Sequence, residues 1–313
     1  MSKQNTNEII KVIISGLDNA GKTSILTALD KKYDFYKDIV SITPTIRIEY
    51  KATQFLSNKV VFWDMGGQEQ YRQIYMVKRD IYFDNTDLLV YVIDIQDEKR
   101  YEQALEYLDM ILQYFQSNEI QVPVIVSFHK FDPEIRNDKK ILNSIESLKN
   151  NILEKYSNFQ ILFQQTSIFD IISIIQLISY GLSIFDEKFF DLSELLEKYI
   201  EIFKCKSLII LDKNGIIISE FYYKVIEPEI YVEFLEAIKE NFFILKRMQE
   251  ESFEPEFNVI NVGDNLISCL HQVKINSESF FVSAIIKEDL KEDFLEKYPE
   301  FVDDLTKILS QLV

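Results

Sequence analysis

The sequence is poor in the residues that mark disordered or extracellular chains. It has only 7 glycines, 6 prolines and 2 cysteines in 313 residues. Few glycines and prolines argue against long low-complexity stretches, and 47% apolar residues supply enough material for packed cores. The two cysteines, Cys205 and Cys269, lie far apart and form no metal-binding motif. We interpret them as buried thiols of a protein kept in a reducing compartment.

Basic residues are also scarce. The chain carries 34 Lys and Arg against 51 Asp and Glu, a net charge of −17, which argues against nucleic acid or an anionic membrane as a direct partner. No apolar run approaches the roughly 20 residues that cross a bilayer. The N-terminus lacks a signal-peptide pattern, and Ser2 excludes N-myristoylation. We therefore predict a cytoplasmic protein without its own membrane anchor, which a partner could recruit to a membrane.

Hydrophobic runs divide the chain into two parts. In residues 1–186, apolar runs alternate with amphipathic helical stretches, which predicts a six-stranded, mostly parallel sheet with helices on both faces. The runs are residues 9–15, 45–55, 59–64, 88–94, 122–128 and 159–164. In residues 187–313 the predicted order is α-β-β-α-β-β-β-α, with an Asn-Gly turn at 214–215 and a long helix at 228–251. This order indicates a second, α+β domain with a five-stranded antiparallel sheet.

The clearest motif follows the first predicted strand. Residues 16–23, GLDNAGKT, satisfy G-x-x-x-x-G-K-[ST] between a strand and a helix. In such a loop, backbone N–H groups surround a phosphate, the lysine (Lys22) bridges the β- and γ-phosphates, and the Thr23 hydroxyl ligates Mg²⁺. The nucleotide contacts predicted for this loop are Asp18, Asn19, Ala20, Gly21, Lys22, Thr23 and Ser24.

A second motif, DMGGQ at 64–68, ends the third predicted strand. Asp64 suits a role in holding Mg²⁺, the N–H of Gly67 can bind a γ-phosphate, and Gln68 is placed to orient attacking water. Between the two motifs, Thr45 is the candidate that senses the γ-phosphate through Mg²⁺, and Thr43 is a weaker one. The predicted catalytic residues are Lys22, Thr45 and Gln68, and the predicted metal ligands are Thr23, Thr45 and Asp64.

The segment before Thr45 offers no arginine to stabilise the transition state. None lies a few residues before Thr45, and Arg47 falls on a predicted strand, where a solvated side chain is the plain interpretation. Because the transition-state charge then lacks one stabiliser, we expect slow intrinsic hydrolysis.

These motifs resemble those of the small GTPases of the Ras superfamily. GLDNAGKTS and WDMGGQ are similar to the Arf family, whereas HKFD at 129–132 resembles the Rag (Gtr) GTPases, which carry His-Lys-x-Asp where others have Asn-Lys-x-Asp. TIRIEY (45–50), KRDIYFDNTDLLVYVID (78–94) and QTSIFD (165–170) also resemble Rag proteins. Asp18-Asn19-Ala20 and Pro44-Thr45 depart from a typical Rag protein toward Arf. A chimera-like or an early-branching relative of the two families fits best.

The resemblance implies a guanine site, with GTP or GDP and Mg²⁺ as cofactors. Asp132 would accept hydrogen bonds from guanine N1 and N2, and the stem of Lys130 would cover the base. His129 would donate a ring N–H that ties this loop to the phosphate loop. Ser167 and Ile168 belong to the loop that would lie against the guanine O6.

The resemblance also implies a roadblock (longin-like) domain at 187–313, which would pair with a second roadblock domain of this chain or of a paralogous Rag-like GTPase. GTPase-activating and exchange proteins would be the other partners of a nutrient-sensing switch. One alternative is an Arf-like trafficking GTPase, which the polar N-terminus disfavours. Another is a nucleotide-bound scaffold whose role is dimerisation, which has no need for all three of Thr23, Thr45 and Gln68.

Overall fold

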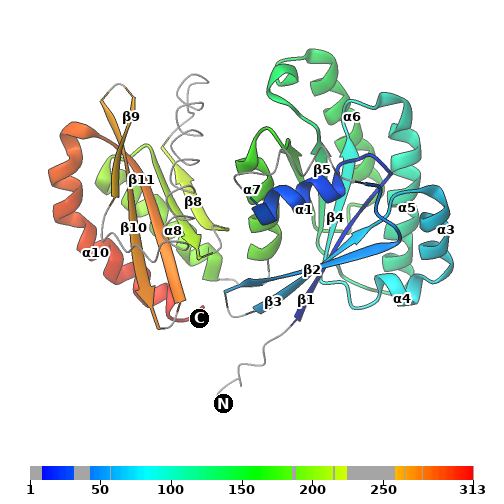
Figure 1. The fold of residues 1–313 in the computed structure, drawn as a ribbon, viewed down its shortest axis with the longest axis horizontal. Coiled ribbons are helices and arrows are strands. Elements are labelled where there is room, and N and C mark those ends of the chain that lie inside the picture. The colour runs from blue at the N-terminus through cyan, green and yellow to red at the C-terminus, as the bar shows by residue number, and fades with distance from the viewer. Residues whose placement is uncertain are drawn as a thin grey trace. The chain divides into compact units, whose positions relative to one another are not determined.

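The chain forms two compact units, Met1–Gly181 and Leu182–Val313, whereas the sequence places the division between 186 and 187. The structure, a computed structural model, describes residues 9–31, 43–56, 58–184, 188–213, 216–223, 258–263, 265–276 and 278–312. Each unit contains its own β-sheet (Figure 1).

The first unit is built on a six-stranded sheet with the order β2-β3-β1-β4-β5-β6. Its strands are β1 (Ile9–Gly16), β2 (Ile48–Phe55), β3 (Asn58–Met65), β4 (Leu88–Asp94), β5 (Val124–His129) and β6 (Ile161–Thr166). β2 pairs antiparallel with β3, and the other neighbours are parallel. The predicted mostly parallel sheet is confirmed. β2 begins later than the apolar run at 45–55 because Arg47 has a left-handed φ of 62°.

Helices cover both faces of this sheet (Figure 1). α1 (Lys22–Lys31) and α7 (Ile171–Ser183) lie on one side, and α3 (Glu69–Val77), α4 (Arg79–Phe83), α5 (Tyr101–Ser117) and α6 (Lys139–Lys155) on the other. The central strands are apolar on both sides for this reason: in β4, LLVYVID, every residue but the last is buried. α7 is apolar almost all round, and Gly181 lets it approach Leu88 and Ile125. The parallel arrangement brings the carboxyl ends of five strands to one edge of the sheet, where ligands bind in such folds.

The second unit is an antiparallel sheet with helices. Its elements are α8 (Lys188–Phe203), β7 (Ser207–Asp212), β8 (Ile217–Tyr222), β9 (Asn258–Gly263), β10 (Leu266–Ile275), β11 (Glu278–Lys287) and α10 (Lys291–Leu309). The sheet has five strands in the order β8-β7-β11-β10-β9, and every neighbouring pair is antiparallel. The predicted antiparallel α+β unit is confirmed. The predicted Asn-Gly turn at 214–215 and the predicted helix at 228–251 lie outside the described residues.

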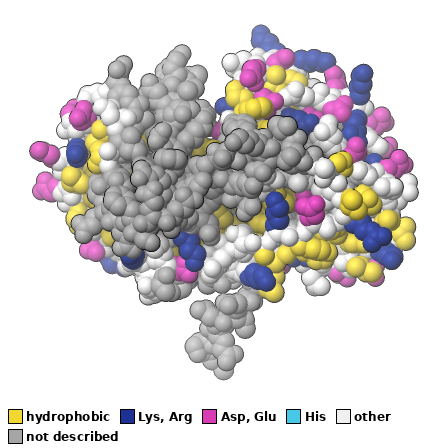
Figure 2. Space-filling view, in the orientation of Figure 1, with side chains coloured by type: hydrophobic (Ala, Val, Ile, Leu, Met, Phe, Trp, Pro, Cys, Tyr) yellow, Lys and Arg dark blue, Asp and Glu magenta, His cyan; other side chains and the backbone are white. Residues whose placement is uncertain are grey.

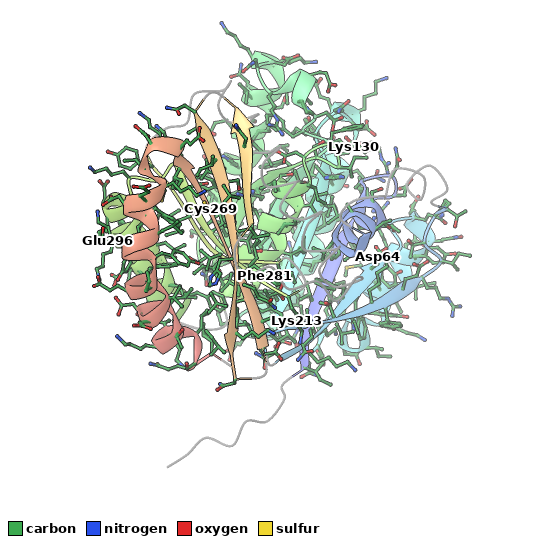
Figure 3. The ribbon with its side chains drawn as sticks, turned by 60° about the vertical axis from the view of Figure 1, so that its left-hand side comes forward. Asp64, Lys130, Lys213, Cys269, Phe281 and Glu296 are labelled. Atoms are coloured by element: carbon green, nitrogen blue, oxygen red, sulfur yellow. The ribbon has the colours of Figure 1, made fainter. Side chains whose placement is uncertain are left out.

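Aromatic side chains form much of the core between α8 and α10. Phe203 of α8 has ring contacts with Phe294, Tyr298 and Phe301 of α10 at centroid distances from 4.8 to 6.3 Å. Glu296 lies on the outer side of α10, away from the strands that carry Cys269 and Phe281 (Figure 3).

Both cysteines are free and buried, as the sequence predicts. Burial raises the pKa of the Cys205 thiol to about 12 and that of Cys269 to about 11, so both stay protonated. On the face drawn in Figure 2, Lys and Arg side chains of the described residues are interspersed with Asp and Glu. In the part of the chain that the structure describes, no helix combines the length and the apolar character needed to cross a membrane.

Candidate functional site

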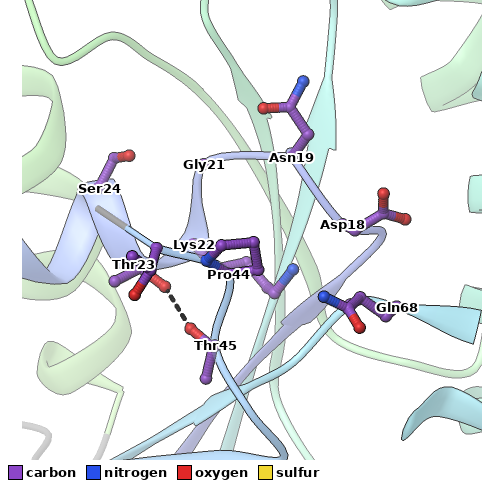
Figure 4. A pocket seen from close by; sticks show the side chains of 11 residues that line it. Asp18, Asn19, Gly21, Lys22, Thr23, Ser24, Pro44, Thr45 and Gln68 are labelled. Carbon is purple, nitrogen blue, oxygen red and sulfur yellow. Dashed lines mark hydrogen bonds between the residues drawn. The ribbon is translucent and has the colours of Figure 1, made fainter. Parts of the chain in front are cut away.

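A pocket of about 250 Å³ lies at the carboxyl ends of β1 and β3 (Figure 4). Its lining comes from all three predicted phosphate segments: phosphate-loop residues between 18 and 24, residues 43–45, and Gly67 with Gln68. Ala20 is buried and lines a neighbouring small cavity instead. The fold therefore gathers residues that are up to 50 positions apart in the chain (18 to 68) around one space.

The phosphate loop holds a buried lysine at its centre. Lys22 is only 5% exposed, and its Nζ donates to the carbonyl oxygens of Gly16, at 3.1 Å, and Leu17, at 2.6 Å. Burial lowers the pKa of this amine to about 8, and the nearby carboxylates of Asp64 and Asp18 oppose the shift. A buried ammonium group gains most from an anionic partner, so this environment favours a phosphate beside Lys22.

The predicted magnesium ligands lie together. Thr23 Oγ1 donates to Asp64 Oδ2 at 2.6 Å and lies 2.8 Å from Thr45 Oγ1, as Figure 4 shows, and Thr45 Oγ1 lies 3.5 Å from the same carboxylate oxygen. Asp64 is fully buried, and burial raises its pKa. Within the described residues its Oδ1 has no hydrogen-bond partner, which is costly for a buried carboxylate. Two hydroxyls and an unsatisfied carboxylate oxygen fit Mg²⁺, which prefers oxygen ligands and keeps several waters.

The DMGGQ segment touches the phosphate loop directly. A Cβ atom on Gly67 would lie 2.2 Å from the backbone N of Asp18, so only glycine permits this approach. Gln68 comes next, as the residue that precedes α3, and its side chain lines the pocket. Close contact at Gly67 thus sets Gln68 at the edge of the phosphate pocket.

The base loop after β5 packs against the phosphate loop through His129. The imidazole is 1% exposed, and a Cβ on Gly21 would lie 2.3 Å from its Cδ2 and 2.6 Å from its Nε2. Its Nδ1 lies 2.8 Å from Thr166 Oγ1. Burial, with help from the charge of Lys130, lowers the pKa of His129 to about 3, so the ring is neutral near pH 7. The other ring nitrogen, Nε2, lies on the side of Gly21 and so faces the phosphate loop.

Loops that follow β4, β5 and β6 meet at Asp132. Its Oδ1 accepts a hydrogen bond from Ser167 Oγ at 2.6 Å, and its Oδ2 accepts one from Gln96 Nε2 at 2.8 Å. Lys130 pairs with Asp94 at 2.7 Å. Ile168 lies in the turn closed by the bridge between Ser167 and Asp170. The structure therefore brings the predicted loops 129–132 and 165–170 together.

Three residues near the end of β4 escaped the sequence motifs: Asp94, Gln96 and Arg100. Arg100 donates to the backbone oxygen of Asp18 at 3.0 Å and to Asp18 Oδ1 at 2.6 Å. Arg100 lies outside the sequence window around Thr45, because it is 55 residues further along the chain (45 to 100). One signal was present in the sequence: an apolar parallel strand that ends in Asp94 places the following residues at the ligand-binding edge.

Comparisons with known proteins agree with this geometry. The sequence profile of the ADP-ribosylation factor family matches residues 1–175. ADP-ribosylation factor-like protein 3 of Chlamydomonas reinhardtii is 38% identical over 122 residues, 39% of this chain and 63% of the relative. ADP-ribosylation factor 3 of Arabidopsis thaliana is 32% identical over 142 residues, 45% of this chain and 71% of that relative.

A Ras-related protein and a solved structure also match. Ras-related GTP-binding protein A of Dictyostelium discoideum is 29% identical over 143 residues, 44% of this chain and 47% of that protein. The nucleotide-analogue-bound Arl6 BBS3 small GTPase of Trypanosoma brucei is 17% identical, with a TM-score of 0.44 over 56% of this chain and 96% of that one. Since the family profile covers more than half of the sequence, the chain belongs to the ADP-ribosylation factor family of small GTPases.

Proposed function

We propose that this protein binds GTP and GDP with Mg²⁺, hydrolyses GTP slowly, and acts as a guanine-nucleotide switch. The observation that carries the proposal is the meeting of Thr23, Thr45 and Asp64 within 3.5 Å beside the buried Lys22. A buried lysine and a buried carboxylate with an unsatisfied oxygen, both at the ligand-binding edge of a parallel sheet, are typical of a functional site.

Each residue has a defined task in this proposal. Lys22 and the loop N–H groups neutralise the β- and γ-phosphates, while Thr23, Thr45 and Asp64 hold Mg²⁺. An ion held by these three residues would supply positive charge to the transferred phosphoryl group. Gln68 orients the attacking water.

The position of Arg100 fits slow turnover. Both of its terminal nitrogens are engaged with Asp18, so this arginine is not free to stabilise the transition-state charge. An activating protein that supplies one would raise the rate by several orders of magnitude.

A finer proposal is that the switch is of the Rag type. The base loop carries the Rag-like histidine, and the contact of its ring with Gly21 supports a retained base-loop function. In that case residues 187–313 form a roadblock-like pairing domain. An Arf-like trafficking GTPase is the second candidate, favoured by the family profile and by the Arf-like relatives. Pairing through the second unit would favour the Rag type.

Gln68→Leu tests the proposed hydrolysis. The wild-type chain should bind GDP and GTP in the presence of Mg²⁺ and release phosphate at about 10⁻³ s⁻¹ or slower. The variant should bind GTP normally and hydrolyse it more slowly still, because its side chain no longer orients water. Calorimetry measures binding, and single-turnover phosphate release measures the rate.

Gln73→Leu is the matched control, since Gln73 is an exposed glutamine one turn further along α3 whose amide contacts only Glu69 in the described structure. It should keep the wild-type rate. A fast basal rate, or wild-type turnover in Gln68→Leu, would assign water positioning to another group.

A further inference from the structure

The loop after β4 supplies a side chain that no nucleotide motif includes. We propose that Gln96 is a positioning residue that fixes the carboxylate of Asp132 for the guanine base and thereby strengthens the preference for bases with a 2-amino group. The inference rests on the proposed guanine-nucleotide function and deepens it.

Gln96 uses both hydrogens of its side-chain amide on the base loop. Its Nε2 donates to Asp132 Oδ2 at 2.8 Å and to the backbone oxygen of Lys130 at 2.7 Å. An NH₂ group has only two hydrogens to donate, so the two bonds together fix its orientation. The side chain therefore links the start of the base loop to the carboxylate at its end.

The position of Gln96 is itself fixed. Its backbone N–H donates to Asp94 Oδ1 at 3.0 Å, and the other oxygen of Asp94 pairs with Lys130 Nζ at 2.7 Å. The N–H of Ile95 donates to the backbone oxygen of His129 at 3.0 Å. Residues 94–96 thus hold the base loop through both backbone and side-chain contacts.

Asp132 receives one donor on each oxygen. Ser167 Oγ donates to Oδ1 and Gln96 Nε2 donates to Oδ2. A carboxylate oxygen has two lone pairs, so one remains on each oxygen. Guanine offers two parallel donors, N1–H and the 2-amino group, which need both of those lone pairs at once. A carboxylate that is already held in plane loses less freedom on binding the base than a rotating one.

If Gln96 instead blocked the base, its removal would change the affinity for guanine nucleotides in the opposite direction. If its amide occupied the lone pair that the base needs, removing it would tighten guanine binding. The two roles can therefore be separated by the direction of one affinity change.

The experiment uses the full chain with Gln96→Leu, which keeps the size of the side chain and removes both donors. Calorimetric titrations with GDP and with inosine diphosphate, whose base has N1–H and lacks the 2-amino group, give the preference for guanine. We expect GDP affinity to fall severalfold, because the bond between Gln96 and Asp132 is exposed to solvent and is therefore worth less than a buried hydrogen bond to a charged group. Affinity for inosine diphosphate should fall less, so the preference shrinks.

Gln113→Leu is the control, because Gln113 Nε2 also donates to an aspartate, Asp109, at 2.8 Å on the exposed side of α5. It should leave both affinities unchanged. An equal loss for both nucleotides in Gln96→Leu would show a general effect on the loop and overturn the inference. Unchanged or tighter GDP binding would also overturn it.

Gln96→Glu gives a second signature. Two carboxyl groups at this distance share a proton, which raises the pKa of the pair, and the protonated Glu side chain becomes a donor to Asp132. Relative to wild type at the same pH, GDP binding should be weak at neutral pH and should recover as the pH is lowered into the range where carboxyl groups take up protons. The charged neighbours Asp94 and Lys130 are present in both proteins. A deficit that does not change with pH would contradict the positioning role.

Failure of the inference and failure of the proposed function are distinguishable. If the wild-type chain does not prefer GDP over inosine diphosphate, the guanine assignment of Asp132 is wrong and the inference falls with it. If wild type prefers GDP and Gln96→Leu keeps that preference, only the role of Gln96 is wrong.

Discussion

His129 replaces the usual asparagine of the base loop with a side chain whose charge depends on pH. In the folded protein its pKa falls to about 3 because the ring is buried, whereas an unfolded chain has a histidine pKa of about 6.5. Between pH 6.5 and pH 3, therefore, the histidine is protonated in the unfolded chain but stays neutral in the folded protein. Lowering the pH through this window favours unfolding.

We predict that His129→Asn makes stability less sensitive to acid. Between pH 6.5 and 4.5 the wild type should lose up to about 1.4 kcal/mol per pH unit more than the variant, the limit for a difference of one proton. Urea unfolding of both proteins at several pH values measures this. Other buried groups such as Asp64 titrate in both proteins, so their contributions to the pH dependence of stability cancel in the comparison. Parallel pH profiles would show that His129 is protonated or exposed in the folded protein.

At the level of elements, the start of α5 is joined to the phosphate loop by the pair of Arg100 and Asp18. Burial opposes ionisation of Asp18, but the hydrogen bond and charge of Arg100 outweigh it, and the pKa of the carboxyl is lowered. A carboxylate beside a triphosphate repels it, and Arg100 offsets that charge. We therefore assign Arg100 to neutralising the loop.

Arg100→Ala should weaken Mg²⁺·GDP binding roughly 2- to 5-fold, a modest loss because the pair is partly exposed and screened. Asp18→Asn in the same chain should restore most of it, since the uncompensated charge is removed. Calorimetric titrations complete the double-mutant cycle, with Lys140→Ala as control for an exposed pair. If the losses of the two single variants simply add, the two residues act independently and the assignment is wrong.

The sequence predicts elements and motifs better than it predicts the contacts between loops. Lys22, Thr23 and Gln68 could be identified because their chemistry lies in consecutive residues at a strand end. Gln96 and Arg100 could not, because they act on Asp132 and Asp18 only after the parallel pairing of β4 with β1 and β5 sets Asp94 opposite His129. The apolar run that ends in Asp94 indicates the edge of the sheet at which the following residues lie, but it does not indicate which loop residues they contact.

At the scale of the whole molecule, the second unit is the part of the chain for which we propose a pairing role. The helix α8 precedes an antiparallel sheet whose outer strands, among the described residues, are β8 and β9. Edge strands in general offer backbone groups for pairing with another chain. In the part of the chain that the structure describes, no three or more His, Cys, Asp or Glu side chains lie together as a metal site would require. His271, within β10, contacts the Tyr298 hydroxyl at 3.0 Å and fits a structural role.

We predict that the full chain dimerises through residues 187–313 and that nucleotide does not control the pairing. The interface should bury on the order of 1,200–2,000 Å², as stable interfaces do. Light scattering at tens of micromolar should give a dimer both with GDP and with a non-hydrolysable GTP analogue. Residues 1–181, which form a compact unit with their own sheet, should be monomeric and still bind GDP.

A dimer that persists in residues 1–181 would place the interface on the first unit. A full chain that stays monomeric, alone and with every roadblock-domain partner tried, would remove the pairing role and favour the Arf-like alternative, because a Rag-type switch works through that dimer.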